Sequence, residues 1–172
     1  MMDKYAFTLE SYKNIQELIR FTDQKSGGVI VVAGLELTVF LNFIDKLGFN
    51  KDYTSLASVA VFLFGIITAI LLAITIYISI FKVVRPRLAN HYNAYEISLF
   101  YFNHLASAKN KTVMFNQFNN VTDDSILRNL TDQIFEVSKI MTTKTNGLYY
   151  SMTTLLYSML TLSLFILVSK FL

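Results

Sequence analysis

The chain has 172 residues, of which 53% are hydrophobic and 16% are charged, and its formal net charge is +3. Because a soluble domain carries about 25% charged residues, this composition excludes a disordered protein and indicates a membrane protein. The absence of cysteine from the sequence excludes disulfide frameworks, cysteine-ligated zinc and a cysteine nucleophile.

Residues 1–26 are predicted to form a cytoplasmic amphipathic helix that leads into the membrane. Apolar side chains recur there at helical spacing, with charged residues between them. They are Leu9, Tyr12, Ile15, Leu18 and Ile19. Four acidic residues, and the lack of a basic stretch followed by an apolar one, distinguish this segment from a signal peptide.

Three apolar runs reach the length of roughly 17–25 residues that is needed to cross the hydrocarbon core of a bilayer. The first, at 27–44, contains Glu36, and the second, at 56–81, has no charge. Together they are predicted to form a transmembrane hairpin over 27–81. The third run lies in residues 149–172, is uncharged until near its end, and is predicted to form the third transmembrane helix.

The basic residues indicate how these spans are oriented. Twelve of the 15 Lys and Arg residues lie before the first run or between the second and the third. Cytoplasmic loops of membrane proteins carry an excess of Lys and Arg. We therefore predict that the N-terminus and residues 82–148 face the cytoplasm, and that the C-terminus faces outside.

Residues 82–148 are predicted to form a cytoplasmic helical region. Apolar residues recur at heptad spacing over 88–106 and again over 127–141, and a polar, Asn-rich loop is expected between them at 109–121. Thr122 is expected to cap the second helix, where two acidic residues follow it.

The helix that begins after Thr122 can run without a stop into the third span, with Gly147 as the position most suited to a kink. The amphipathic helices outside the spans can pack as a small bundle. The predicted fold class is therefore all-α: an integral membrane protein with three transmembrane helices and a small cytoplasmic helical bundle.

The sequence offers no catalytic motif. It has no Gly-rich phosphate loop, no HExxH and no specific pair of carboxylates. His91 and His104 are separated by about 220° around one helix, so they cannot share a metal ion. The basic residues do not interleave with aromatic residues as they do in nucleic-acid-binding proteins. We predict that the protein is not an enzyme, has no cofactor or metal, and binds no nucleic acid.

Glu36 is the unusual residue of the first span, because it lies near the middle of the membrane. A charge there costs roughly 2.5–3.5 kcal/mol. One interpretation is a protonated carboxyl bonded to hydroxyl groups of the other spans, such as Thr68, Thr75 or Tyr157. The other is a polar contact between subunits or a group that lines a pore.

A second unusual position is Lys144, which occupies a heptad position where an apolar residue is expected. Its ammonium either reaches toward lipid phosphates or has a partner inside the bundle: Asp23, Glu96 or an anionic ligand. Arg20, Asp23 and Lys25 lie together just before the first span. They form either an ordinary juxtamembrane charge cluster or part of a site.

Four strings of the sequence, in this order, resemble the transmembrane effectors of the Pycsar antiphage systems. They are RFTDQKSGG, VVRPRL, LFYFNHLA and LTDQIFEVSKIMTTKTNGL, and they extend along nearly the whole chain. The resemblance implies an effector of the bacterial inner membrane that is functionally linked to a nucleotide cyclase. On infection the cyclase makes a cyclic pyrimidine mononucleotide, cCMP or cUMP, and the effector then damages the membrane and stops growth.

Ten residues match motif positions of that family. They are Arg20, Asp23, Lys25, Pro86, Tyr101, Phe102, Asp132, Gln133, Ser138 and Lys144. No stretch alternates apolar and polar residues as a β-roll nucleotide-binding domain would, so a nucleotide would bind in the helical bundle or between subunits. Arginine suits a phosphate and an aromatic face suits a base. The candidate ligand-binding residues are Arg20, Asp23, Lys25, Tyr101 and Lys144.

The alternative hypothesis is a small membrane scaffold whose cytoplasmic bundle recruits a protein partner. Under either hypothesis the spans contact membrane lipid. We also predict a homo-oligomer, because two apolar seams and Glu36 leave more surface than three spans of one subunit can cover.

Overall fold

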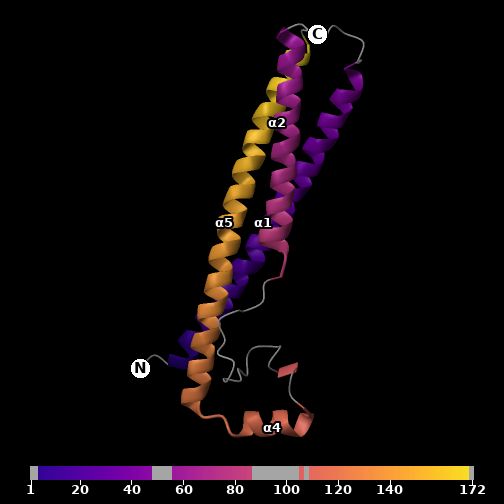
Figure 1. Cartoon of the computed structure of the whole chain (residues 1–172). Coiled ribbons are helices and arrows are strands. Elements are labelled where there is room, and N and C mark those ends of the chain that lie inside the picture. Colours follow the sequence, from indigo (N-terminus) through magenta and orange to yellow (C-terminus); the bar gives the residue numbers. More distant parts are fainter. Residues whose placement is uncertain (1–3, 48–55, 87–104, 107–108, 171–172) are drawn as a thin grey trace. The chain divides into compact units, whose positions relative to one another are not determined.

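The computed structural model describes residues 4–47, 56–86, 105–106 and 109–170. Every regular element in these residues is a helix, and no strand occurs among them. The elements are α1 (Lys4–Lys46), α2 (Leu56–Ile78), the π-helix η1 (Ser79–Val84), α4 (Lys111–Asn119) and α5 (Asp123–Ser169) (Figure 1). α1, α5, and α2 together with η1 are long and apolar enough to cross a membrane. The predicted all-α class with three transmembrane helices is confirmed.

The chain divides into two compact units. The small unit consists of Met1–Arg20 and Pro86–Thr142, and the membrane unit consists of Phe21–Arg85 and Thr143–Leu172. α1 and α5 each contribute residues to both units. As predicted, each of these two helices continues without a break from its amphipathic part into its apolar part.

The start of α5 follows the predicted capping pattern. The backbone N–H of Ser125 donates to the Thr122 hydroxyl at 3.3 Å, and the N–H of Thr122 donates to the Ser125 hydroxyl at 3.1 Å. This reciprocal arrangement satisfies two backbone donors that have no partner within the helix. Asp123 and Asp124 occupy the first turn, where negative charge opposes the positive end of the helix dipole.

The prediction of a loop at 109–121 is wrong, because α4 lies within it. The side chain of Asn110 caps this helix by accepting a hydrogen bond from the N–H of Val113 at 2.8 Å. Asn favours such caps, so a composition that looks unfavourable for a helix interior starts a short helix instead. The heptad over 88–106, with His91 and His104, lies outside the described residues except for its last two positions.

In the membrane unit, three helices pack along one seam whose buried residues recur in steps of three and four. This heptad spacing is typical of helices that pack nearly parallel or antiparallel. On α1 they are Thr22, Ser26, Val29, Ala33, Glu36 and Phe40. On α2 and η1 they are Val61, Gly65, Thr68, Leu72, Thr75, Ser79 and Val83. On α5 they include Lys144, Leu148, Ser151, Leu155, Ser158, Leu162 and Phe165.

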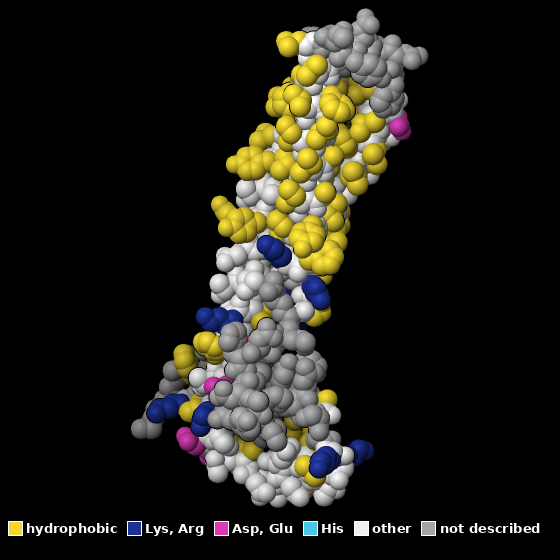
Figure 2. Space-filling view, in the orientation of Figure 1, with side chains coloured by type: hydrophobic (Ala, Val, Ile, Leu, Met, Phe, Trp, Pro, Cys, Tyr) yellow, Lys and Arg dark blue, Asp and Glu magenta, His cyan; other side chains and the backbone are white. Residues whose placement is uncertain are grey.

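The outer surface of the membrane unit is apolar, whereas much of its seam is polar. Figure 2 shows hydrophobic side chains covering the visible face of these helices. Exposed examples are Phe62 on α2 and Leu156 on α5. Lipid tails are as apolar as leucine, so burying an apolar side chain between helices gives no hydrophobic driving force in a membrane. Membrane helices therefore associate through contacts of small and polar residues.

The π-helix η1 changes the register of the seam at the end of α2. Its wider turn is shown by a hydrogen bond between residues five apart: the N–H of Arg85 donates to the carbonyl of Ile80 at 2.9 Å. The extra residue places Val83 in the seam, fully buried, and leaves the side chain of Lys82 exposed. The hydroxyl of Ser26 on α1 donates to the carbonyl of Ser79 at 3.3 Å, at the start of this turn.

Candidate functional site

The buried cation of the membrane unit is paired with an acidic residue of α1. Lys144 on α5 is only 3% exposed, and its Nζ donates to Oδ1 of Asp23 at 2.5 Å. The side chain of Asp23 is 36% exposed and is therefore only partly enclosed by the helices. Of the alternatives considered for Lys144, the structure shows the pairing with Asp23.

The remaining candidate ligand-binding residues have other surroundings. Lys25 is exposed, and its Nζ lies 4.4 Å from the centroid of the Phe21 ring. Arg20 is also exposed on α1. Tyr101 lies outside the described residues. The structure therefore joins Asp23 with Lys144 and places Lys25 against an aromatic face.

Glu36 forms the second polar contact, deep in the seam between α1 and α5. It is 6% exposed, and the hydroxyl of Ser158 donates to its Oε2 at 2.9 Å. Its other oxygen, Oε1, is buried and has no hydrogen-bond partner among the described residues. Half of this carboxyl group is therefore available for a further polar partner.

Glu36 is bonded to a hydroxyl of another span, as one of the two interpretations expected, but the hydroxyl belongs to Ser158 and not to the three residues named as examples. The register of the helices explains the difference. Thr68 donates to the hydroxyl of Thr161 at 2.9 Å, and Thr75 donates to the hydroxyl of Thr154 at 2.8 Å, so both threonines join α2 to α5. Tyr157 is exposed on the outer surface. Its neighbour Ser158 occupies the heptad position that faces α1.

An apolar layer follows the Glu36 contact. The rings of Phe40 on α1 and Phe165 on α5 have centroids 5.3 Å apart. Gly65 on α2 lies against them, because a Cβ atom there would meet Cε2 of Phe165 at 3.3 Å. Val61 and Leu162 complete this buried cluster.

Sequence reasoning missed Ser158, Gly65 and Phe165, although a usable signal exists. The heptad read over 127–141 continues without interruption through Lys144 to Phe165. Extending it would have assigned Ser158 and Phe165 to the seam. Nothing comparable identifies Gly65, whose importance depends on a ring contributed by another helix.

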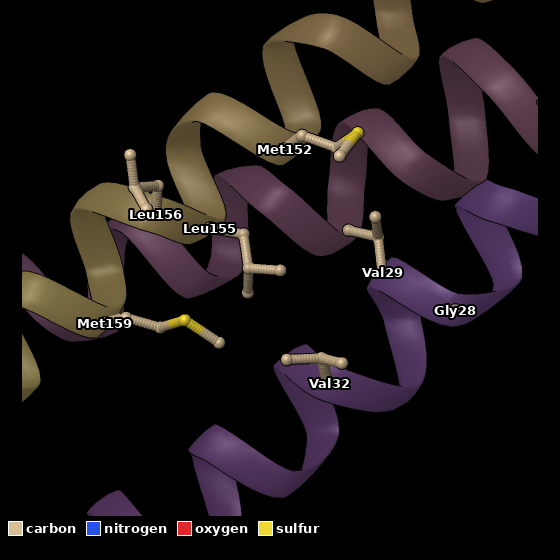
Figure 3. A pocket seen from close by; sticks show the side chains of 7 residues that line it. All are labelled: Gly28, Val29, Val32, Met152, Leu155, Leu156 and Met159. Carbon is tan, nitrogen blue, oxygen red and sulfur yellow. The ribbon is translucent and has the colours of Figure 1, made fainter.

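A groove of about 290 Å³ lies between α1 and α5 and is lined by apolar residues of both helices. Figure 3 shows Val29 and Val32 of α1 facing Leu155 and Met159 of α5 across it. The lining is apolar, so this groove offers no group that recognises a phosphate. The polar candidate site is the seam itself.

Comparisons with known proteins agree with this architecture. The family model described as the Pycsar effector protein domain, PycTM, matches residues 7–169. The chain is 27% identical to the Pycsar effector protein TpPycTM of Treponema porcinum over 81 residues, which are 47% of this chain and 70% of that protein. No solved structure matches the chain. The chain therefore belongs to the Pycsar transmembrane effector family, and it is a membrane-embedded effector of antiphage defence.

Proposed function

We propose that this effector responds to a cyclic nucleotide by permeabilising the bacterial inner membrane, which arrests growth. The observation that supports this most strongly is the polar seam of the membrane unit, in which Glu36 and Lys144 are buried and Lys144 pairs with the partly exposed Asp23. Charged groups in a membrane are costly, and well-packed apolar residues often replace a buried ion pair without loss of stability. The presence of these groups in the seam favours a role in a second, conducting arrangement.

The ligand is proposed to be cCMP or cUMP, and its phosphate would compete with Asp23 for the ammonium of Lys144. A phosphate and a carboxylate make the same kind of charge-assisted hydrogen bond. Lys25, two residues after Asp23 on α1, remains a candidate for a further contact with the nucleotide. Asp23 is only partly buried, which leaves the pair accessible to an anion from one side.

The decisive experiment measures membrane potential in cells that express the effector with or without a pyrimidine cyclase. A voltage-sensitive dye should report depolarisation only when both proteins are present. A cyclase inactivated at its catalytic site serves as the matched control. Growth arrest with an unchanged membrane potential would contradict the proposed mechanism and would favour a scaffold that acts through a protein partner.

We expect the N-terminus and residue Asn110 to face the cytoplasm and Lys170 to face outside, because the basic residues concentrate around the first two. Green fluorescent protein fused at Asn110 should fluoresce, and alkaline phosphatase fused at Lys170 should be active. Phosphatase activity at Asn110, or its absence from a well-expressed Lys170 fusion, would reverse this orientation.

The effector is also proposed to act as a homo-oligomer. In one copy the seam is closed by contacts between side chains, such as Phe40 with Phe165. A lesion that discharges the membrane requires these contacts to separate, and packing against neighbouring copies can stabilise the separated arrangement. The exposed apolar faces of α1, α2 and α5 would then contact both lipid and neighbouring copies.

A further inference from the structure

Polar contacts recur along the seam between buried apolar residues such as Leu72 and Leu155, and Glu36 contributes an acidic group among them. From the end with Lys144, the polar contacts continue through Ser26 with Ser79, Thr75 with Thr154, Glu36 with Ser158, and Thr68 with Thr161. Two of their buried atoms, Oε1 of Glu36 and Oγ of Ser79, have no hydrogen-bond partner among the described residues. The seam therefore contains polar groups with unused bonding capacity.

The polar contacts give way to the apolar layer within about one helical turn. Phe40 follows Glu36 by four residues on α1, and Gly65 precedes Thr68 by three on α2. Phe165 follows Thr161, the partner of Thr68, by four residues on α5. Phe40 is 5% exposed and Phe165 is 2% exposed, so the two rings close the seam.

We propose that Glu36 is the cation-selecting group of a conduction path along this seam, and that Phe40, Phe165 and Gly65 form its hydrophobic gate. With the rings of Phe40 and Phe165 in contact, the path is closed. This inference rests on the proposed permeabilisation of the membrane and specifies what passes: monovalent cations, either K⁺ or protons.

Elementary electrostatics supports this assignment. Rings or clusters of carboxylates favour cations and repel anions, and apolar constrictions stop ions by excluding water until their side chains separate. Oε1 of Glu36 has free lone pairs for a hydrated cation or a proton. An ionisable group inside a membrane is rarely retained without such a role.

The gate is tested without any nucleotide, by measuring ion leak through purified protein in vesicles of bacterial phospholipid. Phe165→Ala should raise the leak about tenfold or more, a change equivalent to only about 1.4 kcal/mol in a barrier. The matched control is Leu164→Ala, which removes an exposed side chain next to it on α5. Circular dichroism and size-exclusion chromatography verify that each variant is folded.

Phe40→Leu provides a second, milder gate variant, because it removes the ring contact but keeps an apolar side chain at the position. It should leak more than the control and less than Phe165→Ala. If Phe165→Ala fails to fold, Phe40→Leu alone decides the question. A folded gate variant that leaks no more than Leu164→Ala would overturn the inference.

Selectivity is tested by adding Glu36→Gln to the leaking variant, since glutamine has the same shape and no charge. Reversal potentials should show preference for K⁺ over Cl⁻ in Phe165→Ala and loss of that preference in the double variant. A pH-sensitive dye inside the vesicles distinguishes proton flux from K⁺ flux. Unchanged selectivity would remove Glu36 from the path.

Failure of this inference is distinguishable from failure of the proposed function. If cells with the cyclase depolarise but the gate variants leak no more ions than the control, the membrane is permeabilised by another route. If wild-type cells do not depolarise, the proposed function itself fails.

Discussion

Replacing Asp23 with alanine is expected to lower the free energy of unfolding by about 3–5 kcal/mol, because it leaves a buried ammonium without its partner. Lys144 is only 3% exposed, so water that enters the space left by the Asp23 side chain can replace the lost carboxylate only in part. Lys144→Met should cost less, about 1–2 kcal/mol, because the side chain of Asp23 is 36% exposed and can be solvated. Thermal unfolding in detergent, followed by circular dichroism, measures both changes.

The double variant Asp23→Ala with Lys144→Met should recover most of the stability lost in Asp23→Ala, since no unpaired charge remains. Lys13→Met is the control, because it removes an exposed cation of α1 and should change stability by at most about 0.5 kcal/mol. Equal losses in the two single variants, or no recovery in the double variant, would show that the ion pair is not what stabilises this position.

The same variants report on signalling when the membrane potential is measured beside stability. If the nucleotide's phosphate takes the place of Asp23, every variant that lacks Lys144 should lose cyclase-dependent depolarisation, including the stable double variant. Unchanged depolarisation in a well-expressed Lys144→Met protein would exclude Lys144 as a ligand contact.

The elements that could be predicted from the sequence are those set by local pattern. The three apolar runs depend only on length and hydropathy, and the cap at Thr122 depends on residues within one turn. The position of Glu36 in the membrane followed from the run that contains it. Its partner did not, because Ser158 is selected by the mutual register of two helices more than a hundred residues apart in the chain.

The π-helix shows a second limit of sequence reasoning. A strict heptad continued from Ser79 predicts Lys82 in the seam, yet the structure buries Val83 and exposes Lys82. One extra residue in a turn reverses which side chain faces the neighbouring helices. The bonds that accompany this turn, such as Ser26 to the carbonyl of Ser79, come from another helix and leave no local signal.

Gly147 is the position where a single added side chain should disturb the membrane unit most directly. It lies within the helix α5 and allows close approach to η1. A Cβ atom at Gly147 would meet Cγ2 of Val83 at 3.0 Å and Cβ of Lys82 at 3.3 Å. A longer side chain must therefore push α5 away from the π-helix.

Gly147→Leu is expected to lower the free energy of unfolding by about 1–3 kcal/mol through overpacking, despite the higher helix propensity of leucine. Gly34→Leu is the matched control, because a Cβ atom at Gly34 meets nothing within 4 Å and leucine there would face lipid. That variant should be as stable as the wild type or more stable. Thermal unfolding in detergent compares the two, and equal stability of both variants would show that α5 does not pack against η1 through Gly147.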